Sequence, residues 1–244
     1  MKIEKNIYEK LYHLETHLWW FESRRSIIMY LIRNIIKPQR KLKILDIGCG
    51  TGSEIDFFTE FGEITGIDSS KEAINLCLKR GLEKKVIEAN AEKLSFPDEI
   101  FDLILCLDVL EHIQYPEFAI AEISRLLKKE GFVVLTVPAF AWLWSEHDKV
   151  SGHFKRYNIK ELKSILQLKN FKLIKMSYFN TFLFPAIVLL RKFKNFIGSK
   201  DNDFAIPIKP INWFLKCVFD SEKFFLKYLD FPFGISIITI IQKI

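Results

Sequence analysis

A loop of alternating glycines is the first feature of this sequence that could do chemistry. Asp46 closes an apolar run, and Gly48, Gly50 and Gly52 follow it. Glycine has no Cβ and readily adopts positive φ, so this loop could bring its backbone close to a ligand. The dinucleotide pattern G-x-G-x-x-G would need a glycine where Ser53 stands. Because a carboxylate repels a pyrophosphate, Asp46 favours a ligand with a positive end.

A second group of reactive side chains lies in the segment 142–157, which reads WLWSEHDKVSGHFKRY. Imidazole titrates near neutral pH, so His147 or His153 could take a proton from a substrate, with Asp148 orienting the ring. The same three residues could instead hold a metal, but their irregular spacing makes that alternative weak. We therefore expect a general base among these histidines and no metal site.

The same segment offers groups that could bind a substrate. Arg156 and Tyr157 could hold an anionic group, since a guanidinium forms strong charge-assisted hydrogen bonds. Trp144 adds an aromatic surface beside them. The alternative for Arg156 is an ion pair with a surface acid. The composition of the segment favours a substrate site.

Short apolar runs alternate with helical patterns along the chain. The strands and helices that they predict must position both the glycine loop and the segment 142–157. The runs are rich in β-branched and aromatic residues, as expected for strands covered on both faces. Strand and helix in turn predict right-handed crossovers and a parallel sheet, so the fold class is α/β, doubly wound. Ligands of such sheets lie beyond the carboxyl ends of the strands. We expect strands at 43–47, 63–68, 84–89, 101–107 and 131–138, and helices at 53–60, 70–80 and 115–129.

Four motifs follow one another in order within residues 42–138. The loop DIGCGTG at 46–52 is followed by Asp68 at a predicted strand end, by NAEKLSFP at 90–97, and by a strand leading to DVLEH at 108–112. This ordered set resembles the class I S-adenosylmethionine-dependent methyltransferases, in particular the branch similar to quinone-biosynthesis methyltransferases. The resemblance implies a mostly parallel seven-stranded, Rossmann-like sheet with an N-terminal helical lid and C-terminal helical additions.

The resemblance also implies S-adenosyl-L-methionine as the cofactor and assigns residues to it. Asp46 and the glycines Gly48, Gly50 and Gly52 would hold its methionyl part, and Arg24 would reach its carboxylate. The acid would balance the ammonium group of the cofactor.

Further cofactor contacts follow from the later motifs. Asp68 would accept hydrogen bonds from the ribose hydroxyls, because a carboxylate is an acceptor on both oxygens. Asn90 and Ala91 would read the adenine edge, with the Asn90 carbonyl oxygen accepting from the amino group. Leu107 would lie near the sulfonium.

The motif at 108–112 and the segment 13–25 carry the remaining implied roles. His112 is a further candidate for catalysis, although Glu111 and His112 could equally form a buried hydrogen-bonded pair. The segment 13–25, HLETHLWWFESRR, would form part of the lid and place Trp20 over the site. The alternative is that its apolar stripe is ordinary core.

The chain is expected to form one methyltransferase domain over 1–244. The lid would occupy 1–40, the cofactor-binding core 41–138, and the substrate-side loop, apolar helices and closing strands 139–244. Strands are expected at 171–178 and 234–243. The four cysteines show no CxxC spacing, which favours reduced thiols and a cytoplasmic protein.

Two apolar segments, 178–198 and 210–229, bear on whether this protein contacts a membrane. Both carry basic residues, among them Arg191, Lys192 and Lys194, and both are too short or too broken to span a bilayer. They could lie at an anionic membrane, at the inner face of the cell membrane, or simply cover the sheet as helices. The net charge of +6 also favours an anionic partner, but no compact basic stripe favours nucleic acid. The oligomeric state stays open.

We interpret the sequence as a methyltransferase acting on the oxygen or carbon of a small, apolar or lipid-linked acceptor. Such an enzyme aligns its acceptor, excludes water and removes a proton where needed. Two alternatives remain: a nicotinamide-dependent oxidoreductase that uses the same loop, and a non-catalytic module that binds S-adenosylmethionine.

Overall fold

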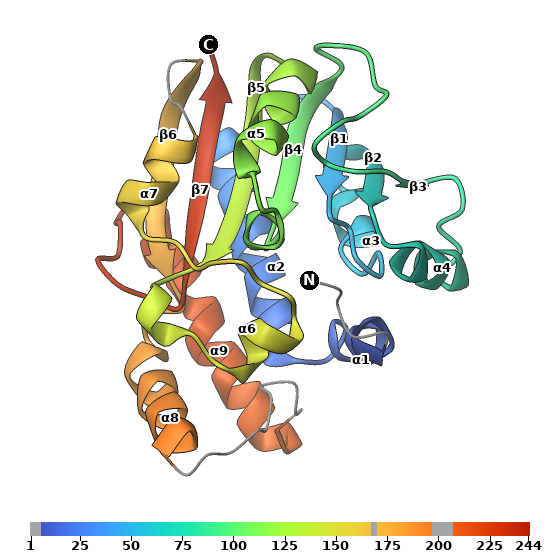
Figure 1. Cartoon of the computed structure of the whole chain (residues 1–244). Helices are drawn as coiled ribbons and strands as arrows, with labels where there is room; N and C mark the ends of the chain where they lie inside the picture. Colours follow the sequence, from blue (N-terminus) through green and yellow to red (C-terminus); the bar gives the residue numbers. More distant parts are fainter. Residues whose placement is uncertain (1–5, 167–169, 197–206) are drawn as a thin grey trace.

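The computed structural model describes residues 6–166, 170–196 and 207–244. The central sheet consists of β1 (Leu42–Ile47), β2 (Gly62–Asp68), β3 (Val86–Glu88), β4 (Phe101–Leu107), β5 (Leu127–Pro138), β6 (Phe171–Phe179) and β7 (Ser236–Lys243). The seven strands lie in the order β3-β2-β1-β4-β5-β7-β6 (Figure 1). The first five run parallel, and β7 lies antiparallel between β5 and β6. The predicted α/β, doubly wound, mostly parallel sheet is confirmed.

Helices cover both faces of this sheet. They are α1 (Asn6–Leu14), α2 (Trp19–Leu31), α3 (Ile55–Phe58), α4 (Lys71–Lys79), α5 (Pro116–Leu126), α6 (Glu146–Val150), α7 (Ile159–Ile165), α8 (Phe184–Phe196) and α9 (Lys209–Leu226). On one face α5 and α7 bury side chains such as Ile123 and Leu162. On the other, α2, α3, α4 and α9 bury a second apolar cluster that includes Ile28 and Phe219. Both faces being covered, every residue of β4 is buried.

Local signals explain where several helices begin and end. The Ser70 hydroxyl accepts a hydrogen bond from the Ala73 N–H at 3.3 Å and caps α4. The helix predicted at 115–129 ends earlier, at Leu126, because Leu127 is fully buried and pairs with Phe101 as the first residue of β5. The helix predicted at 53–60 is reduced to α3, one turn long.

The N-terminal and C-terminal helices gather at the carboxyl edge of the parallel strands. In Figure 1, α1, α6, α8 and α9 all lie around this edge, which is the lower one in that view. Residues 13–25 are not one helix, since an extended Leu18 separates α1 from α2. Trp20 of α2 stacks on Phe219 of α9, with 5.2 Å between ring centroids. Within the described residues, no helix combines the length and apolarity that crossing a membrane requires.

Candidate active site

The glycine loop turns sharply after β1 and comes close to the end of β4. Gly48 has a φ of 69°, and a Cβ there would lie 2.5 Å from a methyl carbon of Val109. A side chain at this position would therefore displace the loop. Gly52 also has positive φ, but a Cβ there would meet Leu82 and Cys77. Packing within the fold, not approach to a ligand, explains the glycine at position 52.

A cavity of about 620 Å³ opens at the carboxyl edge of the sheet. A volume of this size is typical of small-molecule sites. Residues from the N-terminal helices, the glycine loop, several strand ends, the α6 region and α8 line it. The predicted cofactor residues among them are Arg24, Asp46, Gly48, Gly50, Asp68, Asn90, Ala91 and Leu107. The predicted substrate-side and catalytic residues among them are Trp20, His112, His147, His153 and Arg156.

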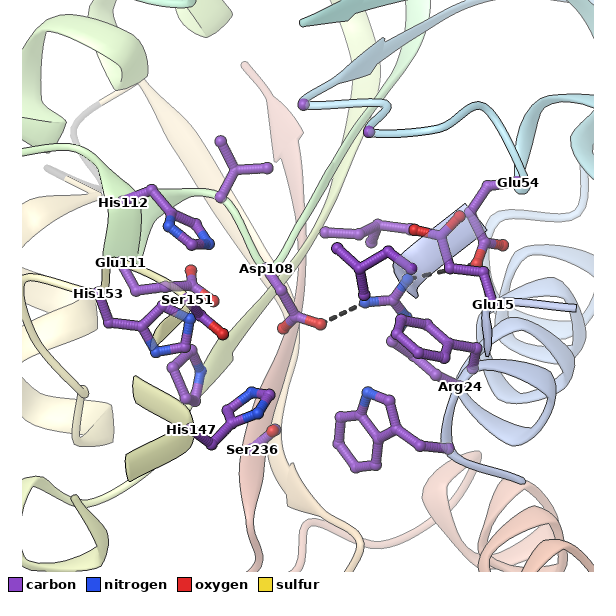
Figure 2. Close-up of a pocket in the computed structure, with 18 of the residues that line it drawn as sticks. Glu15, Arg24, Glu54, Asp108, Glu111, His112, His147, Ser151, His153 and Ser236 are labelled. Atoms are coloured by element: carbon purple, nitrogen blue, oxygen red, sulfur yellow. Dashed lines mark hydrogen bonds and ion pairs between the residues drawn. The ribbon is translucent and has the colours of Figure 1, made fainter. Parts of the chain in front are cut away.

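The cavity has two chemically different ends. Figure 2 shows Arg24, Glu15 and Glu54 on one side, Glu111, His112 and His153 on the other, and Asp108 between them. We call the region around Asp46, Asp68 and the glycine loop the acidic end. The histidine end is defined by Glu111, His112, His147, His153 and Arg156.

Three predicted site residues do not line the cavity: Gly52, Trp144 and Tyr157. Tyr157 is fully buried, and its hydroxyl donates a hydrogen bond to the Leu110 carbonyl at 3.0 Å. The expected contact between Tyr157 and a substrate is thus corrected: this side chain supports the turn that carries Glu111. Trp144 is half-buried beside the cavity without lining it.

Asp46 is a buried acid without a protein partner for one of its oxygens. It is 2% exposed, and its Oδ2 has no hydrogen-bond partner among the described residues. Burial raises the pKa of Asp46 well above its usual range, and the nearby Glu54 charge raises it further. A cationic ligand group beside this carboxylate would offset both effects. The cofactor ammonium group that is expected beside Asp46 is therefore compatible with this part of the cavity.

Asp68 ends β2 and reaches the glycine loop. Its two oxygens accept hydrogen bonds from the Gly50 N–H at 3.0 Å and the Ser70 N–H at 2.8 Å. Burial raises the pKa of Asp68. Each carboxylate oxygen has a second lone pair, so both can still accept from the hydroxyls of a ligand.

Asn90 also lines the cavity. Its Oδ1 accepts a hydrogen bond from the Glu92 N–H at 2.9 Å, which closes a local turn. This bond uses one lone pair of Oδ1. An adenine amino group could therefore donate only to the second lone pair of that oxygen. Ala91 and Leu107 line the cavity without polar side-chain atoms.

Arg24 links α2 to the strand ends. Its guanidinium pairs with Glu54 at 3.3 Å and forms a short ion pair with Asp108. Burial lowers the pKa of Arg24, but the charges of Asp108 and Glu54 outweigh it and raise that pKa. Nε of Arg24 has no hydrogen-bond partner in the part of the chain that the structure describes. The arginine is therefore fixed as a cation at the cavity wall.

Asp148 organises the histidine end. Its Oδ1 lies 2.8 Å from Nδ1 of His153 and accepts a hydrogen bond from Nε of Arg156 at 2.7 Å. Burial raises the pKa of Asp148, but the bonds from His153 and Arg156 outweigh it and hold that pKa well below its usual range. An ionised carboxylate only accepts, so Nδ1 of His153 carries a proton, and in the neutral ring the lone pair is then on Nε2. Arg156 does pair with an acid of the protein, as the alternative predicted, but that acid, Asp148, is fully buried and not on the surface.

Glu111 and His112 sit in a 3-10 turn that follows β4. The rings of His112 and His153 meet edge to face, 4.7 Å between centroids, and those of His147 and His153 lie 5.9 Å apart. Burial lowers the pKa of His112 to about 3, with a further contribution from His153. Burial, with the charge of Asp108, raises the pKa of Glu111 well above its usual range.

Sequence reasoning missed several residues of the cavity, among them three with polar side chains. Glu54 and Asp108 hold Arg24 in place, and Asn180 is fully buried with no partner for either amide atom among the described residues. Asp108 lay in a motif already singled out. Glu54 and Asn180 carry no local signal, because their positions depend on how α3 and β6 meet the cavity.

Comparisons with known proteins bear on the family and the fold of this chain. Residues 45–135 match the family described as methyltransferase domain. Uncharacterized protein MJ1123 of Methanocaldococcus jannaschii is 31% identical over 167 residues, which are 67% of this chain and 78% of that protein. A ubiquinone biosynthesis O-methyltransferase of Alkalilimnicola ehrlichii is 38% identical over 100 residues, 38% of this chain and 40% of that enzyme.

Among solved structures, Haemonchus contortus phosphoethanolamine N-methyltransferase 2 in complex with S-adenosyl-L-methionine has the same fold. Its TM-score is 0.55 at 19% identity, with 89% of this chain and 52% of that chain covered. This chain spans about half or less of the length of three relatives found by sequence, one of which is the O-methyltransferase above.

Proposed function

Because this chain belongs to the class I S-adenosylmethionine-dependent methyltransferases, we propose that it methylates an oxygen or carbon of a small, apolar or lipid-linked acceptor. The family assignment sets aside the nicotinamide-dependent oxidoreductase as an alternative. The observation that carries the proposal is the cavity with its two ends, one acidic and one rich in histidine. The acidic end suits a cationic methyl donor, and the histidine end suits an acceptor that must lose a proton.

The acidic end fits S-adenosyl-L-methionine. Asp46 would hold the ammonium, and Asp68 would accept from the ribose hydroxyls, as their unpaired oxygen and remaining lone pairs allow. Arg24 would attract the carboxylate through Nε, for which the described residues supply no partner. When bound, the cofactor supplies a methyl group activated by a sulfonium. The protein has only to orient the acceptor and exclude water.

The histidine end fits an acceptor that attacks through oxygen. His153 donates from Nδ1 to Asp148, so Nε2 can take the proton of a hydroxyl. His112 and His147 line the same end and are further candidates for this role. Arg156 would attract an anionic acceptor group. A relative named as an O-methyltransferase supports oxygen as the attacked atom.

An apolar wall continues from the histidine end along α8 and α9. Leu183, which immediately precedes α8, lines the cavity there together with Ile187, Leu190 and Leu215. A polar acceptor would leave this surface unused, whereas a hydrocarbon tail would bury it at about 25 cal/mol per Å². We therefore propose an acceptor with an apolar tail.

The outer surface of α8 and α9 supports contact with a membrane that holds such an acceptor. Large apolar side chains are exposed on both helices: Leu189, Phe193, Ile211, Trp213 and Phe214. Basic side chains such as Lys192 and Lys209 accompany them, which suits anionic headgroups. The side chain of Lys194, the third member of the expected basic cluster, lies outside the described residues. We propose peripheral contact with an anionic membrane.

Transfer of a labelled methyl group tests the proposal. Purified protein would be incubated with donor labelled in its methyl group and a total lipid extract, and organic-phase products separated. Label in one chromatographic species, reduced at least tenfold by His153→Ala, is expected. No label in any lipid or metabolite fraction from a protein that binds the donor would overturn the proposal and favour the non-catalytic alternative.

A further inference from the structure

Asn180 brings a buried amide to the wall of the cavity. The residue directly follows β6, is fully buried and lines the cavity, and neither its Oδ1 nor its Nδ2 has a hydrogen-bond partner among the described residues. A buried amide without hydrogen bonds is costly, and a ligand in the cavity would supply the missing bonds. We propose that Asn180 recognises the methyl acceptor, and that its amide binds a neutral polar group which both donates and accepts hydrogen bonds.

The backbone fixes the position of this amide. Asn180 has a φ of 56°, in the left-handed region that asparagine tolerates better than most residues. Glu222 of α9 accepts the Phe182 N–H at 2.7 Å and also interacts with the backbone N–H groups of Asn180 and Thr181. On the opposite side, the Thr181 hydroxyl donates to the Phe233 carbonyl at 2.7 Å. The segment after β6 is therefore anchored both to α9 and to the turn before β7.

The amide lies where the strand ends meet the apolar wall. Pro138 of β5 pairs with Ser236 of β7, and Ser236 pairs with Phe179, the last residue of β6. Pro138, Ser236 and Asn180 all line the cavity, and Figure 2 shows Ser236 in this part of its wall. Leu183, shortly after Asn180 in the chain, belongs to the apolar wall. A polar group at the head of a hydrocarbon tail would therefore meet Asn180.

The chemistry of an amide limits the group that it can bind. Its oxygen accepts and its nitrogen donates, so the ligand must offer a donor and an acceptor together. Two adjacent hydroxyls of a sugar or polyol meet this condition, and so does a carboxamide. An ionised carboxylate only accepts and would leave Oδ1 without a donor. This inference rests on the proposed methyl transfer and narrows its acceptor to a tailed molecule with a neutral group of this kind.

A purely conformational role for Asn180 makes a different prediction. Glycine adopts positive φ without a steric penalty, so Asn180→Gly keeps the backbone conformation and removes only the amide. If asparagine is present only for its backbone, this variant should bind every ligand of the cavity as the wild type does. If the amide recognises the acceptor, the variant should lose selectivity for a ligand that can donate and accept.

Calorimetric titration with three small probes tests this without the natural acceptor. The probes have tails of equal length and are octyl glucoside with adjacent hydroxyls, octanamide with a carboxamide, and methyl octanoate, which only accepts. Each is used below the concentration at which it forms micelles. We expect octyl glucoside or octanamide to bind the wild type about tenfold more tightly than methyl octanoate, because the ester leaves Oδ1 unpaired. The probe that is preferred distinguishes a diol from a carboxamide.

The variants locate this preference in the amide. Asn180→Gly should bind all three probes with similar Kd, and Asn180→Ala repeats the comparison if the glycine variant does not fold. Asn170→Gly is the matched control, because Asn170 is exposed and does not line the cavity, and it should keep the preference of the wild type. Circular dichroism and affinity for S-adenosylmethionine show that each variant is folded. Equal Kd of the three probes for the wild type, or a preference that persists in folded Asn180→Gly, overturns the inference.

Methyl transfer separates this inference from the proposed function. With labelled donor and lipid extract, Asn180→Gly should need about tenfold more extract for half-maximal transfer, while its affinity for the donor stays the same. Transfer that Asn180→Gly leaves unchanged overturns the role of Asn180 and leaves the proposed function intact. Selective probe binding by a protein that transfers no methyl group supports the amide site and removes the proposed function.

Discussion

The Arg24 guanidinium and the Asp108 carboxylate form an ion pair that ties α2 to the carboxyl end of β4. Asp108 also accepts the Thr136 hydroxyl at 2.9 Å, and Arg24 is shared with Glu54. These contacts therefore connect four parts of the chain that are distant in sequence. The pair lies in the cavity wall between the acidic and histidine ends, so the position of α2 and the geometry of the site are coupled.

Replacing Arg24 with Ala should destabilise the fold. The change leaves Glu54 and Asp108 without their cation inside the cavity wall, and breaking such a pair costs about 3 kcal/mol. Urea unfolding measures the loss. Arg33→Ala is the matched control, because its pair with Glu60 is exposed and should contribute less than about 1 kcal/mol. Equal effects of the two substitutions would contradict this view of Arg24.

Replacing Asp68 with Ala should weaken binding of S-adenosylmethionine. The variant leaves ribose hydroxyls without an acceptor in a closed site, which costs about 2 kcal/mol or roughly thirtyfold in Kd. Calorimetric titration gives the affinity, and Asp56→Ala is an exposed acid for comparison. An unchanged Kd in the folded Asp68 variant would remove the ribose assignment.

Tyr157→Phe should lower stability without affecting acceptor binding. The variant leaves the buried Leu110 carbonyl without its donor, a loss of about 1 kcal/mol. Thermal unfolding would detect this, and KM for the acceptor should change less than about twofold because the ring does not line the cavity. A tenfold rise in KM with unchanged stability would restore Tyr157 as a substrate contact.

Glu222 should make stability depend on pH. It lies fully buried on α9, where it accepts the Phe182 N–H at 2.7 Å, and burial raises its pKa to about 7. The folded pKa exceeds the unfolded one of 4.5, so the folded state holds the proton more tightly. This stabilisation is complete below the unfolded pKa and is lost as pH rises toward 7.

Glu222→Gln should remove that pH dependence. The free energy of unfolding of the wild type should fall by up to about 3 kcal/mol between about pH 5 and pH 8 relative to the variant. Urea unfolding across this range provides the comparison. Parallel profiles for the two proteins would show that Glu222 does not titrate in this window.

Membrane contact should depend on both charge and apolar surface. Wild-type protein should sediment with anionic vesicles at low salt and be partly released at physiological salt, where the Debye length is about 8 Å. Replacing Arg191, Lys192 and Lys194 with Gln should weaken sedimentation, and so should Phe193→Ser with Trp213→Ser.

Phe118→Ser provides the control for these membrane variants. Phe118 is also an exposed aromatic residue, 60% exposed, but it lies on α5, away from α8 and α9. Its substitution should leave vesicle binding unchanged. If wild-type protein that is folded and binds S-adenosylmethionine fails to sediment with anionic vesicles, these helices serve only as a cover for the sheet or as a subunit interface.

Local patterns were enough to predict the sheet and the acidic end of the site. The continuous apolarity of β1 and β4, and the position of Asp68 after β2, depend on nearby sequence and on the rule for carboxyl edges. Helix lengths were less predictable. The end of α5 at Leu126 is set by burial of Leu127 beside Phe101, a contact between residues 26 positions apart.

The histidine end shows why the rest could not be predicted. His147, Asp148 and His153 were recognised as a group, but their roles depend on which side chains other segments bring to them. Glu111 and His112 come from the end of β4, and they meet His153 only in the fold. Tyr157, next to Arg156 in sequence, points into the core instead.

The antiparallel placement of β7 has a consequence for synthesis of the protein. β6 lies at one edge of the described sheet, and β3 lies at the other. β7 pairs with β6 on one side and with β5 on the other. At about 5–20 residues per second, the ribosome therefore makes β5 and β6 several seconds before residues 236–243 can bridge them. During that interval the backbone of β5 is open to pairing with other chains. The nascent protein should need protection by a chaperone until its last strand emerges.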